Sequence, residues 1–181
     1  MLKQMRVCGY WHILRLMNNS SEKDYFESLI SLEYTHTAGS ATTRFLEAVA
    51  EGKIVGQKCP RCSAVYVPPR GSCPRDGVPT LEEVTLTDRG CVESFTVVHI
   101  PIPGNPIEPP FVSAMIRLDG ANISFLHLIQ EIPVAEIRIG MRVEAVWKPQ
   151  EEWTTSLENI KWFKPTGEPD IKPESLIFKP K

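Results

Sequence analysis

Two matched turns in the middle of the chain constrain its fold more than any other feature. Cys59-Pro-Arg-Cys62 and Cys73-Pro-Arg-Asp76 share a two-residue gap and the same Pro-Arg filler, and Gly77 follows the second turn. A zinc ribbon is built from two such turns, each of which presents two ligands to one ion. The repetition predicts a zinc ribbon in which Asp76 stands where a fourth cysteine is usual.

The predicted metal ligands are therefore Cys59, Cys62, Cys73 and Asp76. A carboxylate can ligate zinc, but structural sites use mostly cysteine and histidine, so this exchange should weaken the site. Three outcomes stay open: zinc held by three thiolates and Asp76, a metal-free ribbon held by packing, or a site completed by Cys91 or water. Catalytic zinc needs an open position and a nearby general base, and no second acid or histidine is close in sequence. If a metal is bound, we expect its role to be structural.

Alternating and β-branched segments predict five strands after the ribbon. A helix over 42–52, ended by Gly52, and a short strand over 53–58 precede the first cysteine. The later strands are expected over 90–100, 111–118, 122–129, 140–147 and 153–163. A loop with five prolines in ten residues follows the first of them, and a short helical turn separates the third from the fourth. This layout favours an OB barrel, because a β-sandwich normally needs about seven strands.

The predicted fold class is mainly β with N-terminal helices: a rubredoxin-like zinc ribbon followed by a five-stranded OB-fold barrel. Its parts are an N-terminal extension with a helix, the helix and ribbon, the barrel, and a proline-rich tail, over residues 1–41, 42–88, 89–163 and 164–181. The basic and apolar start favours a disordered extension, or initiation at Met17, over a targeting helix. The tail favours a flexible end over an arm that docks on a partner.

Composition limits the partners and the compartment. The chain has 181 residues, 42% of them apolar, and a formal charge of −2, which gives no overall attraction to nucleic acid or anionic membranes. Five cysteines without a secretory signal favour a reducing, cytoplasmic location. No apolar run approaches the roughly 18 residues that a membrane helix needs, so no membrane contact is expected.

The stretch from Phe45 through the two turns, followed by "GCVESFTVVH", resembles a known family of zinc-ribbon and OB-fold proteins. It is the family called domain of unknown function thirty-five, and the resemblance covers roughly residues 42–163. The most specific part is the succession Cys-x-x-Cys, Pro68-Pro69-Arg70 and Cys73-Pro74. Asp76 departs from the four-cysteine form of that family.

The resemblance implies an accessory, non-catalytic role in acyl-CoA or lipid metabolism. Members of that family bind acyl-CoA and associate with thiolase-like or sterol-carrier-type thiolase proteins, and sometimes with hydratase-like subunits. An acyl-CoA binder needs cations for its phosphates and a groove for its chain. The candidate cations are Arg70, Arg61, Arg75, Lys58 and Lys53. Phe95 and Phe111 are candidates for the groove, although a core position is the more common place for each.

Two other function classes remain in view. An enzyme would need a recognisable catalytic arrangement, but the chain has no nucleophile elbow or phosphate loop, and we expect His99 and His127 to be structural. Zinc ribbons and OB barrels also bind RNA or DNA through basic grooves and stacked aromatic rings. The ribbon cations keep this alternative open, although the acidic pI and few aromatic residues make nucleic acid the second choice.

Overall fold

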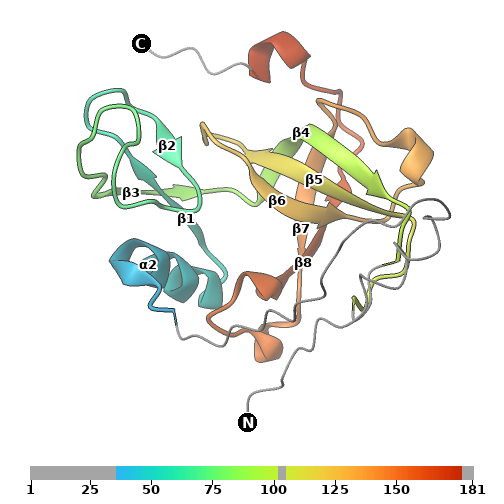
Figure 1. Ribbon diagram of the computed structural model, residues 1–181, viewed down its shortest axis with the longest axis horizontal. Coiled ribbons are helices and arrows are strands. Elements are labelled where there is room, and N and C mark those ends of the chain that lie inside the picture. Colours follow the sequence, from blue (N-terminus) through green and yellow to red (C-terminus); the bar gives the residue numbers. More distant parts are fainter. Residues whose placement is uncertain (1–35, 102–104, 177–181) are drawn as a thin grey trace, which may run out of the picture.

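The computed structural model describes residues 36–101 and 105–176. A helix and a small sheet lie on one side of the molecule and a barrel on the other (Figure 1). The helix predicted near Ser21 lies outside the described residues. Within the described part, no helix is long and apolar enough to cross a membrane.

Helix α2 (Gly39–Ala50) is the predicted helix with three more residues at its start. Its apolar side, with Phe45 and Val49, is buried. Gly52 ends it with a φ of 74° and a backbone N–H that donates to the Val49 carbonyl at 3.0 Å. A left-handed residue after a helix is the common glycine stop.

The ribbon sheet has the order β2-β1-β3, with β1 central. Its strands are β1 (Ile54–Lys58), β2 (Val65–Tyr66) and β3 (Glu82–Leu86), and both neighbours run antiparallel to β1. Strands β2 and β3 were not predicted from sequence. Strand β2 has only two residues, and β3 is mostly polar, so neither has a clear strand pattern of its own. Each forms by pairing with β1 across one of the cysteine turns.

The five predicted barrel strands are present and close in the order β4-β5-β6-β8-β7. They are β4 (Arg89–Val98), β5 (Phe111–Leu118), β6 (Phe125–Ile129), β7 (Arg142–Trp147) and β8 (Ile160–Pro165). The helical turn η1 (Val134–Glu136) lies between β6 and β7, while η2 (Gln150–Glu152) and η3 (Leu157–Asn159) lie between β7 and β8. The expected five-stranded barrel is confirmed.

One hydrophobic core joins the helix, the ribbon sheet and the barrel. It packs Val49 of α2 and Val55 of β1 with barrel residues such as Ile116 and Phe163. The buried Asn159 adds a polar tie, because its side-chain amide donates to the Val49 carbonyl at 3.2 Å. The ribbon sheet is therefore fixed on the barrel, and the cysteine turns project from its far end (Figure 1).

The expected flexible tail is not what the structure shows over residues 164–176. The Ile171 N–H donates to the Gly140 carbonyl at 2.8 Å, and the Asp170 carboxylate accepts from Arg138 at 2.9 Å. Short helix η4 (Pro173–Leu176) follows, and Leu176 is buried. Backbone hydrogen bonds and ion pairs with barrel arginines hold the tail in place. Its order therefore needs no apolar pattern and has no signal in the sequence.

Candidate metal centre and basic loops

The four predicted ligands converge on one point. The ligand atoms of Cys59, Cys62, Cys73 and Asp76 all lie within 4.8 Å of one another. The Cys62 and Cys73 sulfurs are 3.7 Å apart, while an Asp76 carboxylate oxygen is 3.3 Å from the Cys59 sulfur and 3.4 Å from the Cys73 sulfur. Sulfurs about 2.3 Å from a tetrahedral zinc ion stand about 3.8 Å apart. The donor set and its spacing fit zinc.

The two turns have the same backbone structure. The N–H of Cys59 donates to the carbonyl five residues on, and the N–H of Cys73 does the same, at 2.8 Å in both cases. The residue four positions after each cysteine donates back to that cysteine's carbonyl, and both of these residues, Ser63 and Gly77, have a positive φ. Asp76 therefore occupies the place in the second turn that Cys62 occupies in the first.

Backbone and tyrosine donors surround the sulfurs. The Arg61 N–H points at the Cys59 sulfur at 3.4 Å, and the Asp76 N–H points at the Cys73 sulfur at 3.4 Å. The Tyr66 hydroxyl lies 3.2 Å from the Cys73 sulfur. Such outer hydrogen bonds orient metal ligands and stabilise thiolates. Sequence reasoning missed Tyr66, whose only signal is its place four residues after the first turn.

The charges within the cluster shift its protonation. A hydrogen bond to the Asp76 carboxylate raises the pKa of the Cys62 thiol to about 12 and lowers the pKa of Asp76 itself. Burial works to raise the pKa of Cys73, but hydrogen bonds from Tyr66 and two backbone N–H groups outweigh it and lower that pKa. A bound divalent cation would instead lower the pKa of the Cys62 thiol, because a thiol that coordinates a metal is deprotonated.

Cys91 takes no part in this cluster. It lies on β4 of the barrel, where its buried thiol donates to the Arg117 carbonyl at 3.8 Å. The suggestion that Cys91 completes the metal site is therefore wrong. The group of converging ligand atoms among the described residues contains the three ribbon cysteines and Asp76 but not Cys91.

The ribbon arginines differ from the other described arginines in their partners. Five arginines on the helix and barrel form ion pairs with carboxylates: Arg44, Arg89, Arg117, Arg138 and Arg142. Arg61, Arg70 and Arg75 are exposed and have no carboxylate partner within the described residues. Arg61 and Arg75 hold equivalent places in the two turns, one residue before the second ligand of each.

The two candidate lysines are already paired. Lys58 is 3.3 Å from Glu82 on the neighbouring strand, and Lys53 is 2.9 Å from Glu51. The three unpaired arginines are therefore the stronger candidates for an external anion.

The candidate groove residues do not join the cations. Phe95 pairs with the inward-facing Ala114, and Phe111 precedes the inward-facing Val112, so the two rings lie on opposite faces of the sheet. Both belong to the ends of β4 and β5 that lie away from the ribbon (Figure 1). The structure brings the metal ligands together but leaves these two phenylalanines apart from the ribbon arginines.

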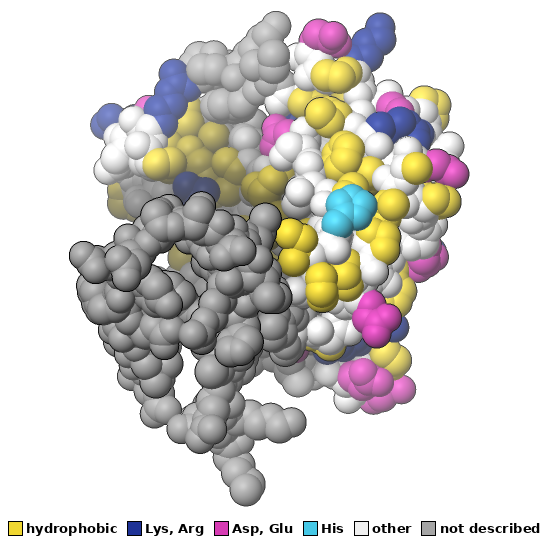
Figure 2. All heavy atoms as spheres, turned by 45° about the vertical axis from the view of Figure 1, so that its right-hand side comes forward, with side chains coloured by type: hydrophobic (Ala, Val, Ile, Leu, Met, Phe, Trp, Pro, Cys, Tyr) yellow, Lys and Arg dark blue, Asp and Glu magenta, His cyan; other side chains and the backbone are white. Residues whose placement is uncertain are grey.

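The barrel surface shown in Figure 2 has an apolar centre. Hydrophobic side chains gather there around a histidine, and acidic side chains stand near the margins (Figure 2). A surface that binds single-stranded nucleic acid instead combines a cationic groove with stacked aromatic rings. In this view the basic side chains lie at the edges of the barrel surface and not across its apolar centre (Figure 2).

Comparison with known proteins assigns both halves of the chain. Residues 46–82 match the rubredoxin-like zinc ribbon domain of ChsH2, and residues 83–148 match the C-terminal OB-fold domain of ChsH2. A DUF35 domain-containing scaffold protein of Methanocaldococcus jannaschii is 35% identical over 101 residues, which are 55% of this chain and 70% of that protein. A scaffold protein of the same description from Methanothermobacter thermautotrophicus is 31% identical, over 55% of this chain and 74% of its own length.

Three further similarities involve two proteins described as enzymes and one solved structure that shows the fold. A probable enoyl-CoA hydratase alpha subunit of Thermomonospora curvata is 31% identical over 57% of this chain but only 32% of that protein. A solved structure described as an Ltp2-ChsH2(DUF35) aldolase has a TM-score of 0.55 and 26% identity, over 70% of this chain and 95% of the matched chain. A DUF35 structure from Sulfolobus solfataricus, at 21% identity and a TM-score of 0.53, supports the fold. The chain belongs to the DUF35 family of zinc-ribbon and OB-fold proteins.

Proposed function

We propose that this chain is a non-catalytic scaffold subunit that binds acyl-CoA and associates with a thiolase-like or hydratase-like enzyme. The family resemblance supports the role, and two relatives are described as scaffold proteins. One similar structure pairs a DUF35 chain with Ltp2 in an aldolase, and one relative is described as a hydratase subunit. The chemistry would then belong to the partner.

The observation that carries the ligand proposal is the set of unpaired ribbon arginines. Arg61, Arg70 and Arg75 are exposed, and none of them forms an ion pair within the described residues. The phosphates of CoA carry several negative charges, and arginine binds phosphate oxygens through paired N–H donors. In this proposal the ribbon holds the phosphate end of CoA, and the partner enzyme receives the acyl end.

Zinc is proposed as the structural ion of the ribbon, held by the three cysteines and Asp76. The ion would fix the two turns that carry Arg61 and Arg75, so their guanidinium groups would be positioned before CoA binds. Preorganised groups lose less conformational entropy on binding. The metal would thus support CoA binding by positioning these arginines, and it would take no part in the reaction of the partner enzyme.

The partner proposal is tested by gentle purification of the tagged full-length protein from its host, followed by mass spectrometry. A thiolase-like or hydratase-like protein recovered in stoichiometric amount is expected, and activity of that enzyme with and without this chain is then compared. Recovery of nucleic acid as the main companion would contradict the proposal and favour the binding-module alternative.

The ligand proposal is tested by calorimetric titration of the full-length protein with CoA and acetyl-CoA. Arg70→Glu should weaken CoA binding by about tenfold or more, the size of a lost charge-assisted hydrogen bond. Lys172→Glu makes the same charge change on the exposed tail and should leave affinity nearly unchanged. Equal losses in both variants would mean that only net charge matters, and the ribbon site would be rejected.

A further inference from the structure

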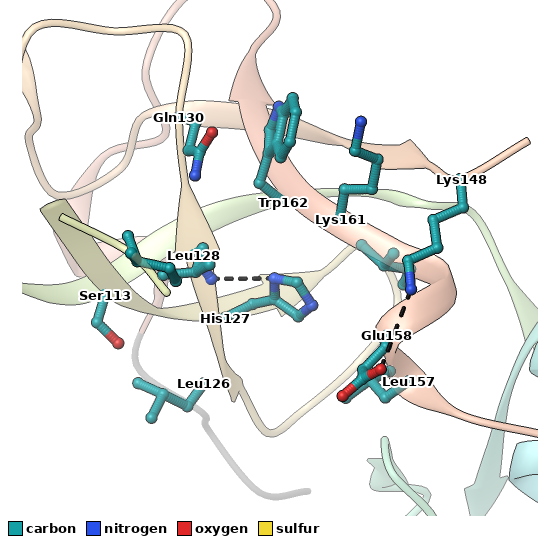
Figure 3. A pocket seen from close by; sticks show the side chains of 12 residues that line it. Ser113, Leu126, His127, Leu128, Gln130, Lys148, Leu157, Glu158, Lys161 and Trp162 are labelled. Atoms are coloured by element: carbon teal, nitrogen blue, oxygen red, sulfur yellow. Dashed lines mark hydrogen bonds and ion pairs between the residues drawn. The ribbon is translucent and has the colours of Figure 1, made fainter. Parts of the chain in front are cut away.

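The groove beside β6 does not form one ligand site. Its lining side chains lie on both sides of the strand: Leu126 and Leu128 point to one side, and His127 points to the other, where Leu157 lies (Figure 3). Alternation along a strand separates these residues, so one small molecule cannot contact both sets. The barrel surface under the tail offers more, because the tail shows which chemistry fits it.

The tail contacts every arginine of the barrel. After β8, residues 166–176 run to the short helix η4 at the top of the view (Figure 1). Each barrel arginine donates hydrogen bonds to a carboxylate or a backbone carbonyl of this segment; they are Arg89, Arg117, Arg138 and Arg142. The barrel therefore binds this segment mainly through guanidinium groups.

Two carboxylates of the tail occupy the centre of this surface. One oxygen of Glu168 lies 2.9 Å from Arg89 of β4, and the other lies 3.3 Å from Arg142 of β7. Two residues on, the Asp170 carboxylate accepts two hydrogen bonds from Arg138, one of them at 2.9 Å. The fork of N–H donors on arginine matches the geometry of a carboxylate. The barrel thus presents a site for two carboxylates with Glu-x-Asp spacing.

Backbone and apolar contacts continue past the two acids. The Ile171 N–H donates to the Gly140 carbonyl at 2.8 Å. A β-carbon at position 140 would lie 2.1 Å from the Ile171 carbonyl oxygen, so this approach requires glycine. The Ser175 carbonyl accepts from Arg117 at 3.4 Å, and Leu176 is buried. The contacts follow one continuous run of chain, so the surface fits a peptide.

The acids of the barrel do not replace the tail at Arg138. The ion-pair partner of Arg138 within the described residues is Asp170 alone. Glu136 lies beside it but offers a backbone carbonyl, at 3.1 Å. Release of the tail would leave Arg138 unpaired, while Arg89 and Arg142 would each keep one barrel carboxylate. A competing carboxylate would therefore bind in the place of Asp170.

The contacts that hold the tail can be exchanged. From Gly167 to Ser175 none of its residues is buried, and the side chains of Arg138 and Asp170 are 54% and 33% exposed. Exposed ion pairs contribute little to stability and weaken in salt. Gly167 has a φ of 78° and open space around it, so it provides a hinge between β8 and Glu168.

We propose that this surface is a docking site for an extended acidic segment of a partner protein, and that the tail occupies it in competition with that segment. The segment carries two carboxylates with Glu-x-Asp spacing. One carboxylate binds Arg89 and Arg142, and the other binds Arg138. The displaced tail moves away by rotation at Gly167. The surface is separate from the ribbon arginines, so this proposal does not rest on CoA binding there.

A peptide with the sequence of residues 168–176 and blocked ends tests the site. It is titrated into the ¹⁵N-labelled full-length variant Glu168→Gln/Asp170→Asn, whose tail has lost both carboxylates. The Gly140 amide and the Nε–H signals of Arg89 and Arg138 should shift. The peptide should bind this variant at least tenfold more tightly than the unaltered protein, where the attached tail competes at high effective concentration.

Control ligands separate carboxylate recognition from other binding. A peptide with Gln and Asn at the two acidic positions should bind at least tenfold more weakly, because it lacks the charge-assisted hydrogen bonds. Equal binding of the two peptides, or no binding of the acidic one, would overturn the proposal. A scrambled peptide of equal charge, or a single-stranded oligonucleotide, that bound as tightly would show a general polyanion surface and would overturn the acidic-segment assignment.

Hydrogen exchange of the unaltered protein gives a measurement that does not depend on that variant. Raising NaCl from about 50 mM to about 1 M should lower the protection of the Ile171 amide about tenfold and leave the barrel amide of Ile116 unchanged. Asp170→Asn should act in the same direction. Glu174→Gln is the matched control, since this exposed tail acid forms no ion pair within the described residues. Protection of Ile171 that ignores both salt and Asp170→Asn would show that the acids do not hold the tail, against the proposal.

Discussion

The cysteine turns and the barrel are held together by different forces. The core around the turns contains only Cys59, Ala64, Tyr66 and Cys73 as buried apolar residues. The main core contains nineteen buried residues from the helix, the ribbon sheet and the barrel. The turns thus bury few apolar residues, while the barrel shares a large core with the helix and the ribbon sheet.

This contrast indicates which part of the molecule a bound metal would stabilise. Structural zinc supplies folding free energy to domains that bury little apolar surface. A metal bound at the turns would stabilise the arginine-bearing loops without being needed by the barrel. Four measurements test this contrast.

The largest expected effect is the loss of the turns on metal removal. Chelation, or the variant Cys73→Ser, should abolish the amide protection of the turns while barrel amides such as Ile116 keep theirs. Structural zinc contributes about 10–16 kcal/mol in small ribbon and finger peptides. Hydrogen exchange followed by NMR measures both regions at once. Cys91→Ala is the control, since it removes a thiol outside the cluster. Turns that stay protected without metal would show that packing alone holds them.

The opposite test weakens the barrel. Phe163 is fully buried and packs edge-on against Phe125 and His127. Phe163→Ala should lower the free energy of unfolding by about 3–5 kcal/mol through lost burial and a residual cavity. Urea denaturation measures the change, and Phe95→Ala, which removes a ring that is 37% exposed, should cost much less. Equal costs would mean that the barrel does not depend on this core.

Asp76→Cys tests the exchanged ligand. A fourth thiolate at this position should tighten zinc binding by about tenfold or more, because zinc in structural sites prefers sulfur donors. Competition with a chromophoric chelator measures the affinity. Asp76→Ala should weaken binding instead. If Asp76→Cys binds zinc no better than the natural sequence, Asp76 is not a ligand.

The smallest expected effect is the pH dependence that His127 gives the barrel. Burial lowers its folded pKa, so below about pH 6.5 the unfolded chain binds the proton more readily. The free energy of unfolding should therefore fall as pH drops through this range, with a slope from this residue of at most about 1.4 kcal/mol per pH unit. His127→Gln should remove that part of the slope, and His99→Gln on the surface should not. Urea midpoints at several pH values decide the point.

The family, the ribbon and the five barrel strands follow from the sequence because their signals are local. A two-residue gap between ligands and a two-residue alternation along a strand are set by neighbouring residues. The end of α2 at Gly52 is local in the same way. Strands β2 and β3 escaped prediction because they exist only as partners of β1.

Tertiary structure alone decided the pairing of charges and the path of the tail. Arg142 finds Asp119 and Glu168, which are far from it in the chain, while Arg61, with the same side chain, finds no carboxylate partner in the described part. Ile171 of the tail donates its N–H to the Gly140 carbonyl, which is also far from it in the chain. Such contacts depend on the relative placement of distant segments, and no short pattern of residues encodes that placement.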